Sequence, residues 1–92
     1  MQLFMERRAT LEDPTRSGAR MLDRAEGVLM ALRRCTVDAA FDEIVSAAKR
    51  HRVPTLSMAH ALVSLAAKSA HDGDATAAAR YEWGSLLDQV RR

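Results

Sequence analysis

The stretch Ala25-Glu26-Gly27-Val28-Leu29-Met30, with Ala40-Phe41 ten residues further on, decides the fold predicted for this chain. Around it, apolar side chains recur at the spacing of one face of an α-helix: Met21, Leu22, Ala25, Val28, Leu29 and Leu32. A glycine inside such a helix costs about 1 kcal/mol relative to alanine. A glycine in this position is typical of a close approach between chain segments. We therefore expect another segment to pack against the backbone at Gly27.

The first helix has a clear start and the second has two clear ends. Asp13 is a suitable N-cap and Pro14 suits the first helical position, so the first helix is predicted from residue 14 to about residue 34. Thr36 is a suitable cap for a second helix, which Val53-Pro54 ends because the residue before proline is disfavoured in helical conformation. Its apolar positions, all expected in the core, are Val37, Ala40, Phe41, Ile44, Val45 and Ala48.

Two more helices follow. A third, capped by Thr55 or Ser57, is predicted to end near residues 71–73, and a fourth begins at Asp74. No segment shows the period-two alternation of a strand, so the predicted fold is all-α. We expect an N-terminal tail or docking segment at residues 1–13, a helical domain at residues 14–70 and a C-terminal helix at residues 74–92.

The charge is weakly basic and the basic residues are mostly arginine. The chain has 14 basic and 12 acidic residues, a net charge of +2, which by itself implies no nucleic-acid partner. All the basic residues except Lys49 and Lys68 are arginine, whose planar guanidinium suits phosphates and bases. An arginine-rich, lysine-poor chain is also what a GC-rich genome produces. No apolar run approaches the roughly 20 residues of a membrane span, and the N-terminal charges follow the apolar residues, unlike a secretory signal. We expect a cytoplasmic protein without membrane contact.

Residues for catalysis or metal binding are not arranged in any familiar pattern. Cys35 is the only cysteine, and His51, His60 and His71 lack metal-ligand spacing. Cys35 is either a redox-sensitive thiol or, as we expect, a small residue at a helix junction. The sequence also lacks a glycine-rich phosphate loop and an ordered nucleophile, base and acid. We therefore predict no enzyme activity, no cofactor and no metal.

Packing positions along the first three helices resemble the ANTAR family of transcription antitermination regulators. The resemblance covers roughly residues 19–66 and rests on Ala25, Gly27, Leu29, Met30, Ala40, Phe41, Ile44, Ala47, Ala59, Leu62 and Val63. It implies a three-helix domain that binds RNA hairpins, with a first helix that supports dimerisation. We thus expect a small three-helix ANTAR-like bundle plus an additional C-terminal helix.

The chain departs from the family pattern at three points. Glu26 stands where members usually carry a lysine, and a carboxylate facing RNA would repel phosphate. The start of the third helix, Pro54-Thr55-Leu56-Ser57-Met58, has no basic residue. Relatives usually follow a sensor domain, for which 92 residues leave no room. Any input signal is therefore expected from a separate sensor protein, unless the chain acts constitutively.

The candidate RNA contacts lie in two arginine-rich clusters, one at Arg33 and Arg34 and the other at Lys49, Arg50 and Arg52. They are expected at opposite ends of the hairpin formed by the first two helices, and Arg24 extends a basic face along the first helix. Tyr81 and Trp83 are expected to cover the bundle rather than to stack on a base. Ordinary solvated helix ends would give the same charge pattern. The predicted RNA-binding residues are Arg24, Arg33, Arg34, Lys49, Arg50 and Arg52.

These observations favour an RNA-binding transcription antitermination regulator that recognises structured RNA hairpins. A homodimer through the first helix and Leu3, Phe4 and Met5 is a further expectation. The alternative is a protein–protein interaction module on the same helical fold, with RNA binding lost. A DNA-binding helix-turn-helix is a weaker third possibility, because residues 55–62, which would begin its recognition helix, include no arginine or lysine.

Overall fold

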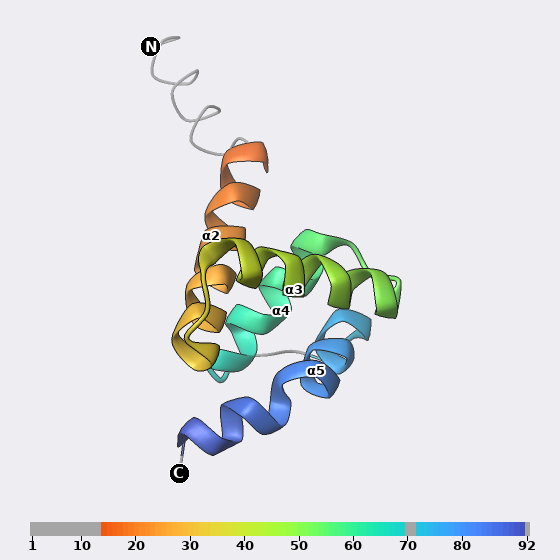
Figure 1. Cartoon of the computed structure of the whole chain (residues 1–92). Helices are drawn as coiled ribbons and strands as arrows, with labels where there is room; N and C mark the ends of the chain where they lie inside the picture. Colours follow the sequence, from red (N-terminus) through yellow and green to blue (C-terminus); the bar gives the residue numbers. More distant parts are fainter. Residues whose placement is uncertain (1–13, 70–71, 92) are drawn as a thin grey trace, which may run out of the picture.

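The computed structural model describes residues 14–69 and 72–91, and this part of the chain contains only helices. Their bounds are α2 (Pro14–Arg33), α3 (Val37–His51), α4 (Thr55–Ala66) and α5 (Asp74–Arg91) (Figure 1). The predicted all-α class, a bundle with an additional C-terminal helix, is confirmed. No helix within the described residues is long and apolar enough to cross a membrane.

Local sequence signals account for the boundaries of α3. The Thr36 hydroxyl accepts a hydrogen bond from the backbone N–H of Ala39 at 3.1 Å, as an N-cap should. Arg52 ends the helix in a left-handed conformation, and Pro54 then precedes the first residue of α4 in an extended one. The three helices α2, α3 and α4 are consequently joined by short connections, which hold them close together.

The core lies where α4 packs between α2 and α5, with α3 crossing over them (Figure 1). Many of its members are alanines, which let helix axes approach closely, and a few large side chains fill the remaining space. The largest fully buried side chains are Trp83, Leu29, Ile44, Met58 and Leu62. The core therefore includes a tryptophan from α5 as well as residues of the first three helices.

The prediction that Phe41 belongs to the core is wrong. The buried face of α3 consists of Ala40, Ile44, Ala47 and Ala48, whereas Phe41 is 41% exposed. Phe41 follows Ala40 by one residue, which rotates it by about 100° around the helix axis, to the flank of the buried face. Val37, one turn earlier, is exposed as well.

The expectation for Gly27 is also wrong, and Gly18 takes the role assigned to it. A Cβ atom built on Gly27 meets nothing within 4 Å, since this residue lies on the exposed side of α2. A Cβ atom on Gly18 would lie 2.8 Å from Cδ1 of Leu56 at the start of α4. Gly18 precedes buried Ala25 by two helical turns and so shares its face, whereas Gly27 does not.

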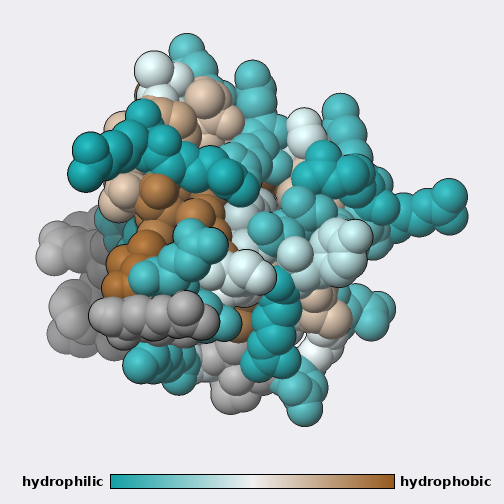
Figure 2. Space-filling model, turned by 60° about the horizontal axis from the view of Figure 1, so that its bottom comes forward, coloured by the Kyte–Doolittle hydropathy of each residue, from teal (hydrophilic) through white to brown (hydrophobic). Residues whose placement is uncertain are grey.

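Most of the face shown in Figure 2, at the bottom of Figure 1, is hydrophilic, with one hydrophobic patch among the polar side chains. The exposed apolar side chains of the described residues include Met30, Leu56 and Val90. On this face the apolar surface is therefore local rather than continuous, as is usual for a small domain.

Candidate nucleic-acid interface

The six predicted RNA-binding residues are all exposed, but they fall into two groups. Arg33 and Arg50 form ion pairs with glutamates on neighbouring helices. The other four have no ion-pair partner among the described residues: Arg24, Arg34, Lys49 and Arg52. The structure thus separates cations that brace the bundle from cations that are available to a ligand.

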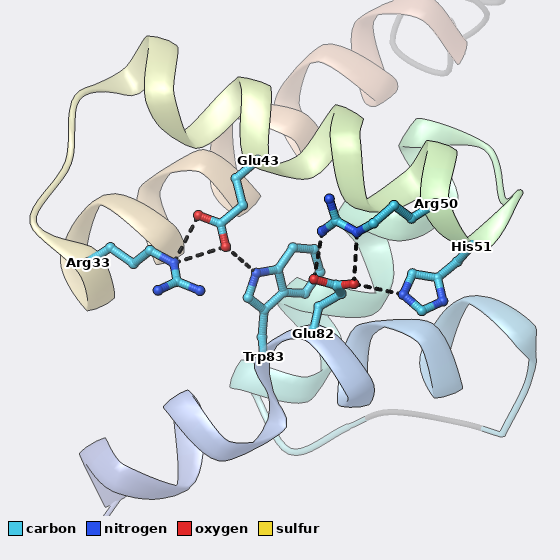
Figure 3. Close-up of polar contacts among 6 residues, drawn as sticks. All are labelled: Arg33, Glu43, Arg50, His51, Glu82 and Trp83. Atoms are coloured by element: carbon cyan, nitrogen blue, oxygen red, sulfur yellow. Dashed lines mark hydrogen bonds and ion pairs between the residues drawn. The ribbon is translucent and has the colours of Figure 1, made fainter.

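Arg33 belongs to a cluster that joins α2, α3 and α5 (Figure 3). Its Nε lies 2.9 Å from the carboxylate of Glu43 on α3. The same carboxylate accepts a hydrogen bond from Nε1 of Trp83 at 2.7 Å. Since Trp83 is fully buried, this bond satisfies the one polar group of its indole. Glu43 therefore fixes both the end of α2 and the tryptophan of α5.

A second cluster joins the end of α3 to α5 (Figure 3). Nη2 of Arg50 lies 2.8 Å from one oxygen of Glu82, and Nε2 of His51 lies 2.8 Å from the other. The hydrogen bond from Arg50, with a further contribution from His51, holds the pKa of Glu82 below its usual value despite burial, which acts in the opposite direction. Glu82 is therefore a charged anchor for two basic residues of α3.

Sequence reasoning missed Glu43 and Glu82. Each pairs with residues far away in the chain, 40 positions for Glu43 with Trp83 and 32 for Glu82 with Arg50, so no local spacing reveals them. Trp83 is buried, as expected. Tyr81 is not: it is 82% exposed, and the prediction that it covers the bundle is wrong because it lies two residues away from Trp83, on another side of α5.

Basic residues occupy all three positive-φ positions outside glycine in the described residues. These are Arg34, Arg52 and Lys68, with φ of 54°, 56° and 59°, each just after a helix. Glycine is the usual residue here, because a side chain in this conformation costs about 1–2 kcal/mol. The ends of α2 and α3 therefore carry exposed arginines in a strained conformation. A glycine at either position would adopt the same conformation without strain.

Glu26, which occupies the position of the usual lysine, is 7% exposed. Burial raises the pKa of its carboxyl, and the negative charges of Asp23 and Asp38 add to the effect. The side chain of Glu26 is therefore largely covered by its neighbours, unlike the exposed cations without ion-pair partners.

Within the described residues, no three metal-ligating side chains come together. Cys35 is half-buried between α2 and α3, with its Sγ 3.8 Å from the carbonyl oxygen of Leu29.

Comparison with known proteins agrees with the resemblance noted in the sequence. A family model described as the ANTAR domain matches residues 15–63, more than half of the chain. The match takes in α2, α3 and most of α4, and it leaves α5 outside. No curated protein and no solved structure matches the chain.

Proposed function

Because the chain belongs to the ANTAR domain family, whose members are regulatory RNA-binding domains rather than enzymes, we propose that it binds structured RNA hairpins and acts in transcription antitermination. The protein would favour one of two competing RNA folds by binding it more tightly than the other. The shift cannot exceed its differential affinity for the two folds. We place this activity in the cytoplasm, where nascent transcripts are made.

The observation that best supports this proposal is the pair of strained, exposed arginines, Arg34 and Arg52. Residues with backbone strain of this kind cluster at active sites and ligand-binding sites. With Arg24 and Lys49, these two arginines are the four predicted RNA-binding residues that form no ion pair among the described residues, and arginine binds phosphate oxygens through two parallel N–H groups. Arg33 and Arg50 take a secondary part, because part of their hydrogen-bonding capacity is already used within the bundle.

The direct test is a titration with a two-hairpin leader RNA and with length-matched duplex DNA at several salt concentrations. We expect selective binding to RNA that weakens with salt, because each phosphate contact contributes roughly 0.7–0.9 to the slope of log K against log salt. Arg34→Gly and Arg52→Gly together should weaken RNA binding about tenfold or more, while thermal stability stays equal or rises because the strain is relieved.

Two results would contradict the proposal. Equal affinity for RNA and duplex DNA would show nonspecific charge attraction. An absence of binding to either, even at low salt, would favour the alternative of a protein–protein interaction module. The exposed apolar side chains of Met30, Val37 and Phe41 are the observation in favour of that alternative.

We also propose that the protein is a homodimer through α2 and that it receives its signal from a separate sensor protein. Leu3, Phe4 and Met5, which the sequence assigns to the dimer contact, lie outside the described residues. Sedimentation of the protein over a range of concentrations tests the dimer, and a monomer at high concentration would exclude it.

A further inference from the structure

A hollow of about 350 Å³ lies between the end of α3 and the first turns of α5. Its lining residues are His51, Asp74, Ala77, Ala78 and Tyr81. Four of these belong to α5, beyond the part of the chain that the family model matches. The lining therefore includes none of the cations assigned to phosphate binding, although the hollow lies beside the basic end of α3.

The hollow has two aromatic side chains, the exposed Tyr81 and the partly buried His51. Tyr81 is 82% exposed, and its ring meets that of His51 edge-on, with 5.5 Å between the ring centroids. His51 is in turn fixed by Glu82, which its Nε2 contacts at 2.8 Å (Figure 3). Ala77 and Ala78 add only methyl groups to the lining, which leaves space for a flat ring. An oriented aromatic face beside open space suits the stacking of another ring.

The charges around the hollow also fit a nucleotide. Asp74 contributes a carboxylate, which accepts hydrogen bonds but donates none while ionised. Lys49 and Arg52 flank the end of α3 with free positive charge, and Glu82 holds the guanidinium of Arg50 between α3 and α5. Positive charge for a phosphate and an acceptor for base N–H groups thus occur within one end of the molecule.

We propose that this hollow binds one unstacked base from the loop of an RNA hairpin, an inference that rests on the proposed RNA-binding function. The base stacks on Tyr81, and its amino and imino groups donate to Asp74. Guanine fits best, because two N–H donors lie side by side on its Watson–Crick edge. The phosphates next to the base lie against the cations at the end of α3.

The main test compares Tyr81→Ala with Tyr81→Phe, both in the full chain. Binding is measured for a hairpin RNA and for a blunt RNA duplex with the same stem. Tyr81→Ala should weaken hairpin binding by about fivefold to 100-fold, the usual effect of one lost stacking contact, and should leave duplex binding unchanged. Tyr81→Phe keeps the ring and should stay within about twofold of the native protein. Thermal melting verifies that each variant is folded, which the exposure of Tyr81 favours.

Base identity provides the second test. Hairpins that differ in a single loop base should bind most tightly with guanine at that position, and Asp74→Asn should abolish this preference, because the amide adds a donor where only acceptors suit the base edge. Equal loss of hairpin and duplex binding in Tyr81→Ala, or no loss in either, would overturn the proposal.

A titration without RNA separates this proposal from the proposed function. Guanosine monophosphate at millimolar concentration should shift the NMR signals of the Tyr81 and His51 rings, whereas ribose phosphate should not. If the protein binds no hairpin but these shifts appear and vanish in Tyr81→Ala, the function is wrong and the base site stands. If the guanosine nucleotide shifts neither ring, the base site is wrong whatever the RNA titrations show.

Discussion

Helices α2, α3 and α4 are held together differently from the way α5 is held to them. The first three pack mainly through alanines and a few aliphatic side chains, such as Leu29, Ile44 and Leu62. Helix α5 adds Ala78, Ala79 and Leu87 to this core, and it is also attached by one fully buried indole and by two carboxylates that bridge it to α3. Apolar packing tolerates small adjustments, whereas a buried polar pair needs both partners. The attachment of α5 should therefore be sensitive to single atoms and to pH.

The largest effect is expected at the indole. Trp83→Ala should lower the free energy of unfolding by about 3–5 kcal/mol, because it leaves a large cavity and removes the hydrogen bond from the indole to Glu43. Trp83→Phe keeps most of the ring and should cost less. Urea denaturation followed by circular dichroism measures both. A loss below about 1 kcal/mol for Trp83→Ala would mean that α5 is an appendage and that the core closes without it.

The next effect concerns Arg50, whose ion pair with Glu82 competes with its binding to RNA. Glu82→Gln should release Arg50 from a charged partner, so that hairpin RNA binds about threefold more tightly and the salt slope steepens by up to about 0.9. Asp88→Asn is the matched control, because it removes one exposed charge from the same helix without breaking an ion pair among the described residues. Equal gains in the two variants would show that only net charge matters.

The contributions of Glu82 and Glu26 to folding stability should change with pH in opposite directions. The pKa of Glu82 is lowered by folding, so its stabilisation is complete above its ordinary pKa and is lost as pH falls through the lowered value. The pKa of Glu26 is raised, so its ionisation destabilises the fold at neutral pH and has no effect once pH falls below its ordinary value of 4.5.

Melting curves over a pH series compare the two directly. Near pH 7, Glu82→Gln should lower Tm and Glu26→Gln should raise it, each by a few degrees, as expected for about 1 kcal/mol in a small domain. In both variants the difference from the native protein should shrink as the carboxyls become protonated in acid. A gain from Glu26→Gln that persists unchanged at acid pH would exclude an electrostatic origin.

The smallest effect is expected from the glycines of α2. Gly27→Ala should stabilise the protein by about 0.5–1 kcal/mol, since the new methyl group meets open space and the helix gains a better former. Gly18→Ala should gain less, because the Leu56 side chain must move aside. A larger gain at Gly18 than at Gly27 in thermal melting would reverse this assignment.

The sequence predicted what depends on local rules. Thr36 and Pro54 marked the bounds of α3 and α4, and the spacing of Ala25, Leu29 and Ile44 identified part of the core. It misplaced Phe41. The spacing of apolar residues identifies one side of a helix, but the width of the buried face depends on how the neighbouring helices pack against it.

Within the candidate site, the exposed cations were predictable as a set, but their division into paired and free was not. Arg50 must meet Glu82 across 32 residues for that division to exist, and only the packed fold brings them together. The residue-by-residue assignment to RNA stays a prediction, and the experiments above are its test.

The burial of Trp83 has a consequence for folding of the chain during its synthesis on the ribosome. The chain is made from its N-terminus, so α2, α3 and α4 are complete while the side chain that fills their shared core has yet to be synthesised. Until then Ile44, Leu62 and their neighbours remain without their largest partner. The native core can therefore close only after residue 83 has been synthesised, although the match to the family model ends at residue 63.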